Sequence, residues 1–163
     1  MTQDGPGSVI VLTGPCGAGK STVARLITDR LKPSVHLHTD DFYTCIRQGF
    51  IPPYLPESHR QNEVVLGVLS GCAFGYAAGG YHVVLDGVVG PWSVQKFRTA
   101  VEQAAIPLSY VILRPELDVV MTRATGRGPE ALTEPGPVRQ MYEQFTRLGE
   151  YEPYTFRFGS AHT

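Results

Sequence analysis

The residues best suited to chemistry form a glycine-rich stretch near the N-terminus, Gly14-Pro15-Cys16-Gly17-Ala18-Gly19-Lys20-Ser21. This stretch fits the pattern G-x-x-x-x-G-K-[ST] at every fixed position. Glycines here let backbone N–H groups turn inward around phosphate oxygens, in conformations that a side chain would block. A helix that begins directly after the loop would point its positive N-terminal end at the same anion. The stretch therefore predicts a site for the phosphates of a nucleotide.

Three residues at the end of this loop have distinct predicted roles. Lys20 would reach the β- and γ-phosphates, and the Ser21 hydroxyl would ligate Mg²⁺, with Thr22 one position further into the helix. The alternative is a glycine-rich turn between a strand and a helix, with no ligand. The neighbouring sequence favours the phosphate site, because an apolar strand pattern precedes the loop and an amphipathic helix pattern follows it.

Two adjacent carboxylates, Asp40 and Asp41, follow the second apolar run of the chain. Transfer of a phosphoryl group to an alcohol needs a group that orients the hydroxyl and accepts its proton. A carboxylate at the end of the strand beside the phosphate loop is well placed, and at a strand end the two side chains would point in different directions. The alternative is that an aspartate before Phe42-Tyr43 only caps a short helix. The phosphate loop favours a catalytic role for at least one of the two.

A third acidic residue, Asp86, ends the apolar run Val83-Val84-Leu85. In this position it would hold Mg²⁺ directly or through water. The alternative is a turn, because Asp86-Gly87 is a common turn dipeptide. The residue types favour neither interpretation.

Strand-like and helix-like segments alternate along the chain. Short apolar runs predict strands over 8–13, 35–39, 81–85, 108–113 and 154–158. Apolar residues three or four apart predict helices over about 21–31, 58–78, 93–104, 117–124 and 138–148. Ser58 and Gln61 resemble a capping box at the start of the second helix. The alternation predicts an α/β fold with a mostly parallel sheet covered by helices on both faces. In such sheets ligands bind beyond the C-terminal ends of the strands.

Size and composition fit one domain spanning residues 1–163, with one hydrophobic core. The formal net charge of −1 disfavours a nucleic-acid partner, which would need a local basic groove. The five histidines and three cysteines show no metal-ligand spacing. Cys16, Cys45 and Cys72 are therefore expected to be reduced thiols. Residues 1–8 lack a signal-peptide pattern and no apolar run suits a membrane span, so we expect a cytoplasmic protein.

The segments Gly14–Thr22 and His38-Thr39-Asp40-Asp41-Phe42-Tyr43 together resemble the P-loop kinases of the nucleoside-monophosphate-kinase-like superfamily. The resemblance covers roughly residues 8–150. It is strongest for the branch with polynucleotide 5′-kinases, chloramphenicol phosphotransferase, gluconate and shikimate kinases and zeta-toxin-like proteins. It implies a P-loop NTPase fold, a five-stranded parallel sheet in the order 2-3-1-4-5, and Asp40 as the general base. The family has a final helix after the fifth strand, which we do not expect here because the sequence has no pattern for it.

The related kinases carry arginines on a lid that closes over the phosphates, and the resemblance places this lid at Arg123 and Arg127. Gly126, Gly128 and Pro129 interrupt the chain there, as in a movable segment. Arginine neutralises the charge that spreads over the transferred phosphoryl group. The alternative is a solvated basic face of a helix, because the two arginines lie four residues apart.

These features together predict a phosphotransferase that uses ATP and Mg²⁺ and takes the hydroxyl of a small molecule, a metabolite or an antibiotic, as acceptor. Two alternatives remain open. One is a kinase that acts on a nucleic-acid 5′ end or a nucleotide sugar. The other is a nucleotide-binding module without catalysis, in which the Asp40-Asp41 pair is only a cap. The sequence leaves the oligomeric state open.

Overall fold

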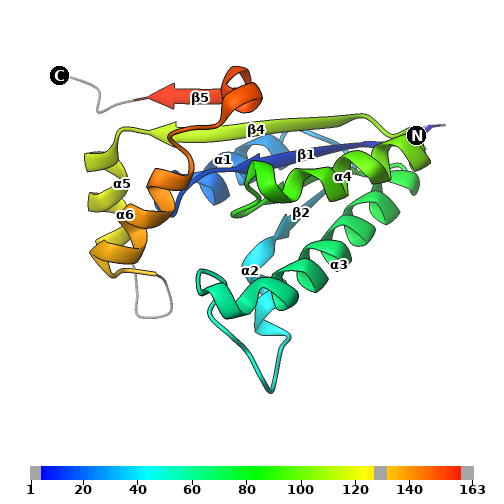
Figure 1. The fold of residues 1–163 in the computed structure, drawn as a ribbon. Helices are drawn as coiled ribbons and strands as arrows, with labels where there is room; N and C mark the ends of the chain where they lie inside the picture. The colour runs from blue at the N-terminus through cyan, green and yellow to red at the C-terminus, as the bar shows by residue number, and fades with distance from the viewer. Residues whose placement is uncertain (1–4, 127–131, 159–163) are drawn as a thin grey trace.

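The chain folds around one five-stranded parallel sheet (Figure 1). The computed structural model describes residues 5–126 and 132–158, apart from the side chain of Gln103. The strands are β1 (Ser8–Thr13), β2 (Ser34–His38), β3 (His82–Asp86), β4 (Leu108–Pro115) and β5 (Thr155–Phe158). They lie in the order β2-β3-β1-β4-β5 and every pair is parallel. The predicted fold class and the predicted order 2-3-1-4-5 are confirmed.

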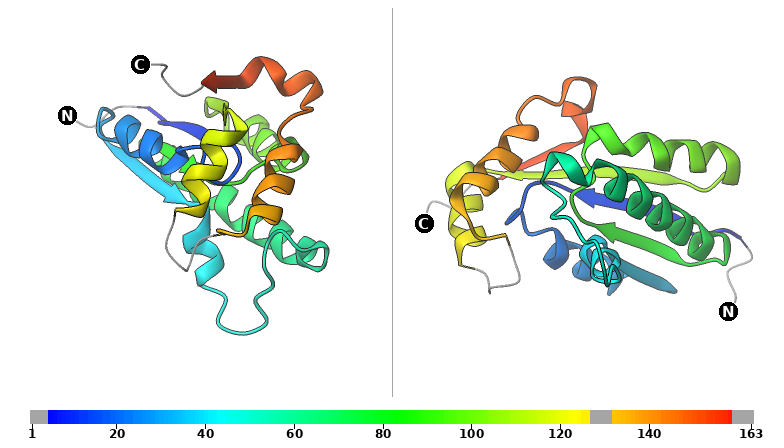
Figure 2. Two further views of the ribbon diagram at one scale, coloured as in Figure 1. Left: turned by 90° about the vertical axis from the view of Figure 1, so that its left-hand side faces the viewer. Right: turned by 60° about the horizontal axis from the view of Figure 1, so that its bottom comes forward.

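Helices cover both faces of the sheet (Figure 2). They are α1 (Lys20–Thr28), α2 (Thr39–Thr44), α3 (His59–Ala78), α4 (Pro91–Ala104), α5 (Leu117–Thr125) and α6 (Pro135–Gln144), with 3₁₀ turns η1 (Pro56–Ser58) and η2 (Gly149–Tyr154). Helix α1 packs against β1, β2 and β3 on one face, whereas α3 and α4 lie on the other. Helices α5 and α6 pack against each other beyond the C-terminal end of β4. Within the part of the chain that the structure describes, no helix is both long and apolar enough to cross a membrane.

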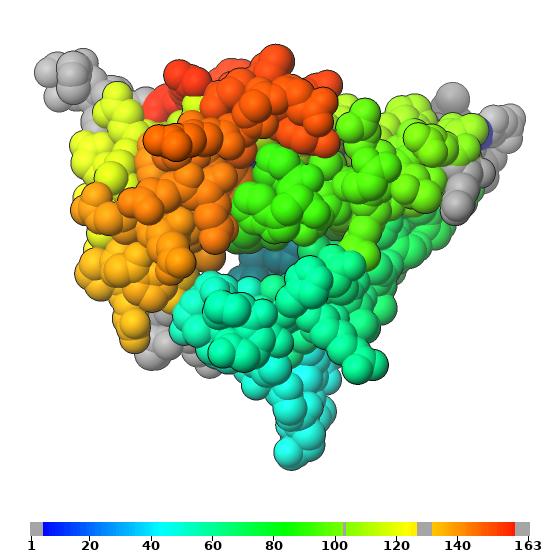
Figure 3. Space-filling model, in the orientation of Figure 1, coloured from blue at the N-terminus to red at the C-terminus, as the bar shows by residue number. Residues whose placement is uncertain are grey.

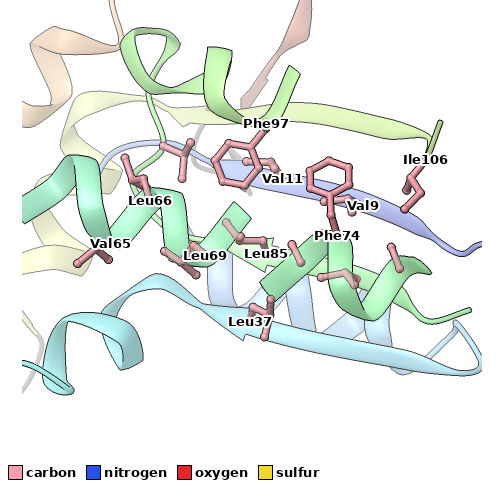
Figure 4. Packing of buried hydrophobic residues seen from close by; sticks show 14 residues of the cluster. Val9, Val11, Leu37, Val65, Leu66, Leu69, Phe74, Leu85, Phe97 and Ile106 are labelled. Carbon is pink, nitrogen blue, oxygen red and sulfur yellow. The ribbon is translucent and has the colours of Figure 1, made fainter. Parts of the chain in front are cut away.

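The core consists of apolar clusters on the two faces of the sheet. The larger cluster lies between the sheet and helices α3 and α4, where Val11, Leu69, Leu85 and Phe97 are fully buried (Figure 4). The cluster under α1 includes the buried Ala24. Strands covered on both faces need apolar residues at nearly every position, which is why the strand sequences are continuous apolar runs.

The predicted capping box at the start of α3 is wrong. Ser58 is the N-cap residue, but its hydroxyl donates to the backbone carbonyls of Pro53 (2.9 Å) and Leu55 (2.7 Å). The Gln61 side chain reaches back to the loop, where it accepts from the Ile51 N–H (2.9 Å) and donates to the Ile51 carbonyl (2.6 Å). Both residues therefore fix the loop between α2 and α3, because its backbone groups have no strand or helix partners.

Arg114, near the end of β4, has a structural role. Its side chain is only 8% exposed and donates to the Phe145 carbonyl. It also forms a two-pronged ion pair with Glu152, with N–O distances of 3.0 and 2.9 Å, and Arg157 reaches the same carboxylate at 2.9 Å. The pair joins β4 to η2, and a fork of this kind is the strongest geometry that arginine offers a carboxylate.

We expect the ion pair between Arg114 and Glu152 to stabilise the fold at neutral pH and to lose this effect in acid. Hydrogen bonds from Arg114 and then Arg157 lower the pKa of Glu152 from 4.5 to about 2. A pKa that is lower in the folded state gives stability above the unfolded-state pKa, and this stability is lost as the pH falls towards the folded-state pKa. The difference in urea midpoint between the parent and Glu152→Gln should therefore shrink from pH 5 to pH 3. Glu57→Gln, at an exposed glutamate of η1, is the control; a difference that is constant with pH would contradict the linkage.

Candidate functional site

The glycine-rich loop runs from the end of β1 to the start of α1. Gly14, Gly17 and Gly19 have φ angles of 143°, 81° and 88°, which side chains rarely allow. A Cβ on Gly14 would also lie 2.1 Å from the carbonyl oxygen of Leu113. Pro15 and Ala18 are buried, and Cys16 is half-buried. The loop thus has the strand–turn–helix context that the phosphate-site prediction requires.

The lysine of the loop folds back onto its own backbone. Lys20 is the first residue of α1, and its Nζ donates to the carbonyls of Gly14 and Pro15, both at 2.9 Å. Ser21 and Thr22 follow in the first turn of α1 and are exposed. A cation, a helix N-terminus and two exposed hydroxyls therefore lie together, a combination suited to binding phosphate.

Asp86 is the last residue of β3, and its side chain is fully buried. One carboxylate oxygen, Oδ1, accepts a hydrogen bond from His38 Nδ1. The other, Oδ2, lies 3.5 Å from His36 Nε2 but has no hydrogen-bond partner among the described residues. Burial raises the pKa of Asp86, but the hydrogen bond from His38, the Ser21 hydroxyl and the charges of His38 and His36 together hold the pKa below its usual value. The group is therefore a carboxylate with one unsatisfied oxygen.

Ser21 and Asp86 fit a Mg²⁺ ion held beside nucleotide phosphates. Both supply oxygen, the ligand that Mg²⁺ prefers. A buried carboxylate oxygen without a partner is costly unless something polar fills the place beside it. Residues 5–126 and 132–158 contain no cluster of three or more histidine, cysteine or acidic side chains able to hold a metal alone. A Mg²⁺ ion here would therefore need further ligands from phosphates and water.

Asp40 and Asp41 belong to a short helix. Strand β2 ends at His38, and Thr39, Asp40 and Asp41 form the first turn of α2. The pair does follow the C-terminal end of β2, but it lies in a helix and not in extended backbone, and the N-cap alternative is wrong because His38 occupies the N-cap position. Asp-rich first turns are favourable, since the N-terminal end of a helix carries partial positive charge.

Asp40 is a carboxylate that solvent can reach. Its side chain is 77% exposed, and its Oδ2 lies 3.4 Å from His38 Nε2. A hydrogen bond with His38 lowers the pKa of Asp40 more than partial burial raises it, and the positive charge of Lys20 lowers it further. Asp40 therefore lies close enough to Lys20 for the charge of the lysine to lower its pKa, and Asp40 remains ionised at neutral pH.

His38 joins the two carboxylates, and the sequence analysis missed it. Hydrogen bonds to Asp40 and then to Asp86 raise its pKa to about 10, so that both ring nitrogens donate. The sequence analysis considered histidines only as zinc ligands. The signal that could have found it is the strand register. In a sheet where the second and third strands are neighbours, His38 and Asp86 pair with each other at the C-terminal ends of these two strands.

Of the two predicted lid arginines, Arg123 lies within the described residues. Arg123 is exposed in the last turn of α5, and its Nη1 would lie 3.7 Å from a Cβ on Gly19. Its guanidinium group therefore lies beside the phosphate loop. Arg127 and most of the predicted lid, residues 127–131, lie outside the described residues.

One face of the molecule is hollowed (Figure 3). Figure 3 shows this hollow between α6 in orange, the α4 region in green and the start of α3 in teal, with darker blue atoms of the N-terminal third at its floor. Tyr43, half-buried, donates from its hydroxyl to Asn62 Oδ1 (3.0 Å). Burial, and then the charge of Asp40, raise the pKa of Tyr43 to about 12. This contact ties α2 to α3 on the Asp40 side of the site.

Comparisons with known proteins agree with this geometry. The sequence matches the family model described as AAA domain over residues 9–148. No curated protein matches it. The APS kinase CysC of Mycobacterium tuberculosis in complex with AMPPNP and APS is similar in structure, with a TM-score of 0.66 and 20% identity over 98% of this chain and 91% of that chain. A sugar kinase from Janibacter sp. HTCC2649 has a TM-score of 0.65 and 15% identity over 94% and 86%.

A third structure links the same fold to nucleic acid. The Pnkp1/Rnl/Hen1 RNA repair complex has a TM-score of 0.58 and 16% identity over 87% of this chain and 45% of that chain. At these identities the likeness shows the fold alone, which is that of the P-loop NTPases. The family match spans most of the sequence, from the first strand to the end of the last α-helix. The chain therefore belongs to the AAA domain family and has a P-loop NTPase fold.

Proposed function

We propose that this chain transfers the γ-phosphoryl group of ATP, bound with Mg²⁺, to a hydroxyl of a small molecule. The main support is the position of Asp40, an exposed carboxylate that feels the charge of Lys20 in the phosphate loop. A carboxylate there lies at the phosphate end of a bound nucleotide, where an acceptor hydroxyl must arrive.

Each residue of the site has a part in this mechanism. The loop amides, Lys20 and the N-terminus of α1 bind the phosphates. Ser21 and Asp86 would hold Mg²⁺, which would neutralise charge on the phosphate oxygens. Asp40 accepts a hydrogen bond from the acceptor hydroxyl and orients it. The transition state of phosphoryl transfer is loose, so orientation matters more than early proton removal, and an ionised carboxylate of low pKa suits this task.

The loop between α2 and α3 supports a small acceptor. The side chains of Ser58, Gln61 and Asn62 fix this loop, with Asn62 Nδ2 donating to the Pro53 carbonyl at 2.8 Å. A fixed loop beside the hollow in Figure 3 suits a pocket for a metabolite or an antibiotic. The APS kinase and the sugar kinase are named for small substrates. The overall charge of −1 gives no general attraction to nucleic acid.

A panel of acceptors tests the proposal. The purified chain is incubated with MgATP and sugars, sugar acids, nucleosides, hydroxyl-bearing antibiotics, nucleotide sugars and an oligonucleotide with a free 5′-hydroxyl. Phosphorus NMR follows the new phosphate ester, and EDTA serves as the metal-free control. We expect Mg²⁺-dependent transfer to one class of small acceptor. Transfer only to the oligonucleotide or to nucleotide sugars would replace the proposal with the alternative kinase, and tight ATP binding without any transfer would favour a binding module.

Arg123 should contribute to turnover. Replacing Arg123 by alanine is expected to lower kcat/KM for ATP by about tenfold to a hundredfold, the usual loss for a hydrogen bond to a charged group. Arg139→Ala, at an exposed arginine of α6, is the matched control for loss of one positive charge. Steady-state kinetics of both variants gives the comparison. Equal effects of the two changes would mean that Arg123 acts only through the overall charge.

A further inference from the structure

His38 lies between two carboxylates that have different tasks in the proposed mechanism. Its Nδ1 donates to Oδ1 of Asp86, the proposed metal ligand. Its Nε2 lies 3.4 Å from Oδ2 of Asp40, the proposed base. An imidazole ring is rigid, so the two contacts fix the distance and the angle between these carboxylates.

The backbone determines this arrangement. The parallel register of β2 and β3 pairs His38 with Asp86. Leu37 faces the core beneath α3, so His36 and His38 point to the opposite face, towards α1. Gly87 follows Asp86, and a Cβ on it would lie 2.0 Å from Thr39 Oγ1. Glycine at this position therefore lets the start of α2 pack against the end of β3, which places Asp40 beside the ring of His38.

The contact with His38 also gives the two oxygens of the Asp86 carboxylate different surroundings. Oδ1 is taken by the ring, whereas Oδ2 has no hydrogen-bond partner among the described residues. The Ser21 hydroxyl lowers the pKa of the same carboxylate. A carboxylate held by one oxygen presents the other in a fixed direction, as the outer hydrogen-bond partners of metal ligands commonly do.

We infer that His38 is a positioning residue, which holds Asp40 and the unsatisfied oxygen of Asp86 towards the same phosphoryl group. The inference deepens the proposed function and rests on it for the roles of the two carboxylates. His36 cannot take over this task, because among the described residues the one carboxylate that its side chain contacts is that of Asp86, at 3.5 Å. His38 itself does not touch the reacting atoms in this scheme; it acts through its two partners.

Two amide substitutions separate the two contacts. In His38→Asn the amide nitrogen lies near the place of Nδ1, so that the contact with Asp86 is kept and the contact with Asp40 is lost. In His38→Gln the amide nitrogen reaches further, towards the place of Nε2, so that the contact with Asp40 is kept. His38→Ala loses both contacts. His59→Asn, at an exposed histidine that begins α3, is the control for loss of a histidine.

Hydrolysis of MgATP, with water as the acceptor probe, gives the kinetic test. We expect His38→Asn to lower kcat by about tenfold to a hundredfold, the usual cost of losing such a supporting contact. Its half-saturating Mg²⁺ concentration should stay close to that of the parent. His38→Gln should show the opposite pattern, with a raised Mg²⁺ requirement and a kcat nearer to the parent. Equal effects of Asn and Gln, or parental kinetics for His38→Ala, would overturn the inference.

Proton NMR of the ligand-free chain tests the geometry without any turnover. We expect the ring signals of His38 to shift both in Asp86→Asn and in Asp40→Asn, because the ring contacts both carboxylates. Ring signals that stay unchanged in either variant would overturn the inference. If the parent binds MgATP but neither hydrolyses nor transfers it, the proposed function fails instead. The NMR result, with calorimetry of MgATP on His38→Asn and His38→Gln, would then still decide whether His38 orients the two carboxylates.

Discussion

Replacing Lys20 by alanine is expected to lower ATP turnover at least about a hundredfold, and to weaken ATP binding strongly, while the fold remains intact. The Lys20 amino group lies in the phosphate loop and donates to the carbonyls of Gly14 and Pro15. These contacts hold the amino group where β- and γ-phosphates would bind, so that it can exchange carbonyl partners for phosphate oxygens. Removing one such donor from a site of developing negative charge commonly costs a hundredfold to a thousandfold in rate. Calorimetry with ATP and a coupled assay of ADP release measure the two effects.

The stability of this variant distinguishes a ligand effect from a folding effect. Two backbone carbonyls lose hydrogen bonds to a charged donor, each worth about 1.5–3 kcal/mol, so the variant should be less stable but should still unfold in one cooperative transition. Lys32→Ala, at an exposed lysine after α1, removes the same charge outside the loop and should leave ATP binding unchanged. If Lys20→Ala binds and hydrolyses ATP like the parent, the interpretation of the loop as a phosphate site is wrong.

The sheet was predictable because its strands are buried on both faces. The strand Ser8–Thr13 has the predicted bounds, and β4 differs only at its end, which extends to Pro115. Continuous apolar runs separated by amphipathic helices leave few alternatives to a parallel sheet. The strand order came from the resemblance to P-loop kinases, since the runs alone do not state which strands are neighbours.

The region after β2 was harder to predict, because contacts distant in sequence decide it. Asp40 and Asp41 lie in a helix of six residues, too short for periodicity to reveal. Ser58 and Gln61 have the spacing of a capping box, yet their side chains bond to the preceding loop, whose unpaired backbone groups offer better partners. The spacing of residues in the sequence shows which side-chain contacts are possible. Which of these contacts forms depends on the loop, whose backbone groups need hydrogen-bond partners.

Replacing Asp40 by asparagine is expected to leave ATP affinity nearly unchanged and to lower transfer to the acceptor by roughly a hundredfold or more. The affinity should persist because the loop amides, Lys20 and the metal supply the binding. The transfer should fall because asparagine keeps the shape of the side chain but not the charge that orients the hydroxyl. Calorimetry with MgATP gives the affinity, and phosphorus NMR of the acceptor product gives the rate. Hydrolysis by water, measured without acceptor, is subtracted.

Asp41→Asn is the matched control, because it removes the same charge from the next residue of the same helix turn. Asp41 is exposed, and its recorded contacts are at its backbone carbonyl, which accepts from Thr44 Oγ1 (2.7 Å) and Cys45 Sγ (3.4 Å). Its carboxylate should therefore contribute mainly through the partial charge of the helix end, at about 0.3–1 kcal/mol of stability. Transfer should stay within a few-fold of the parent. The reverse ranking would move the base to Asp41 and leave the kinase proposal standing, whereas full transfer by both variants would remove the base from the mechanism.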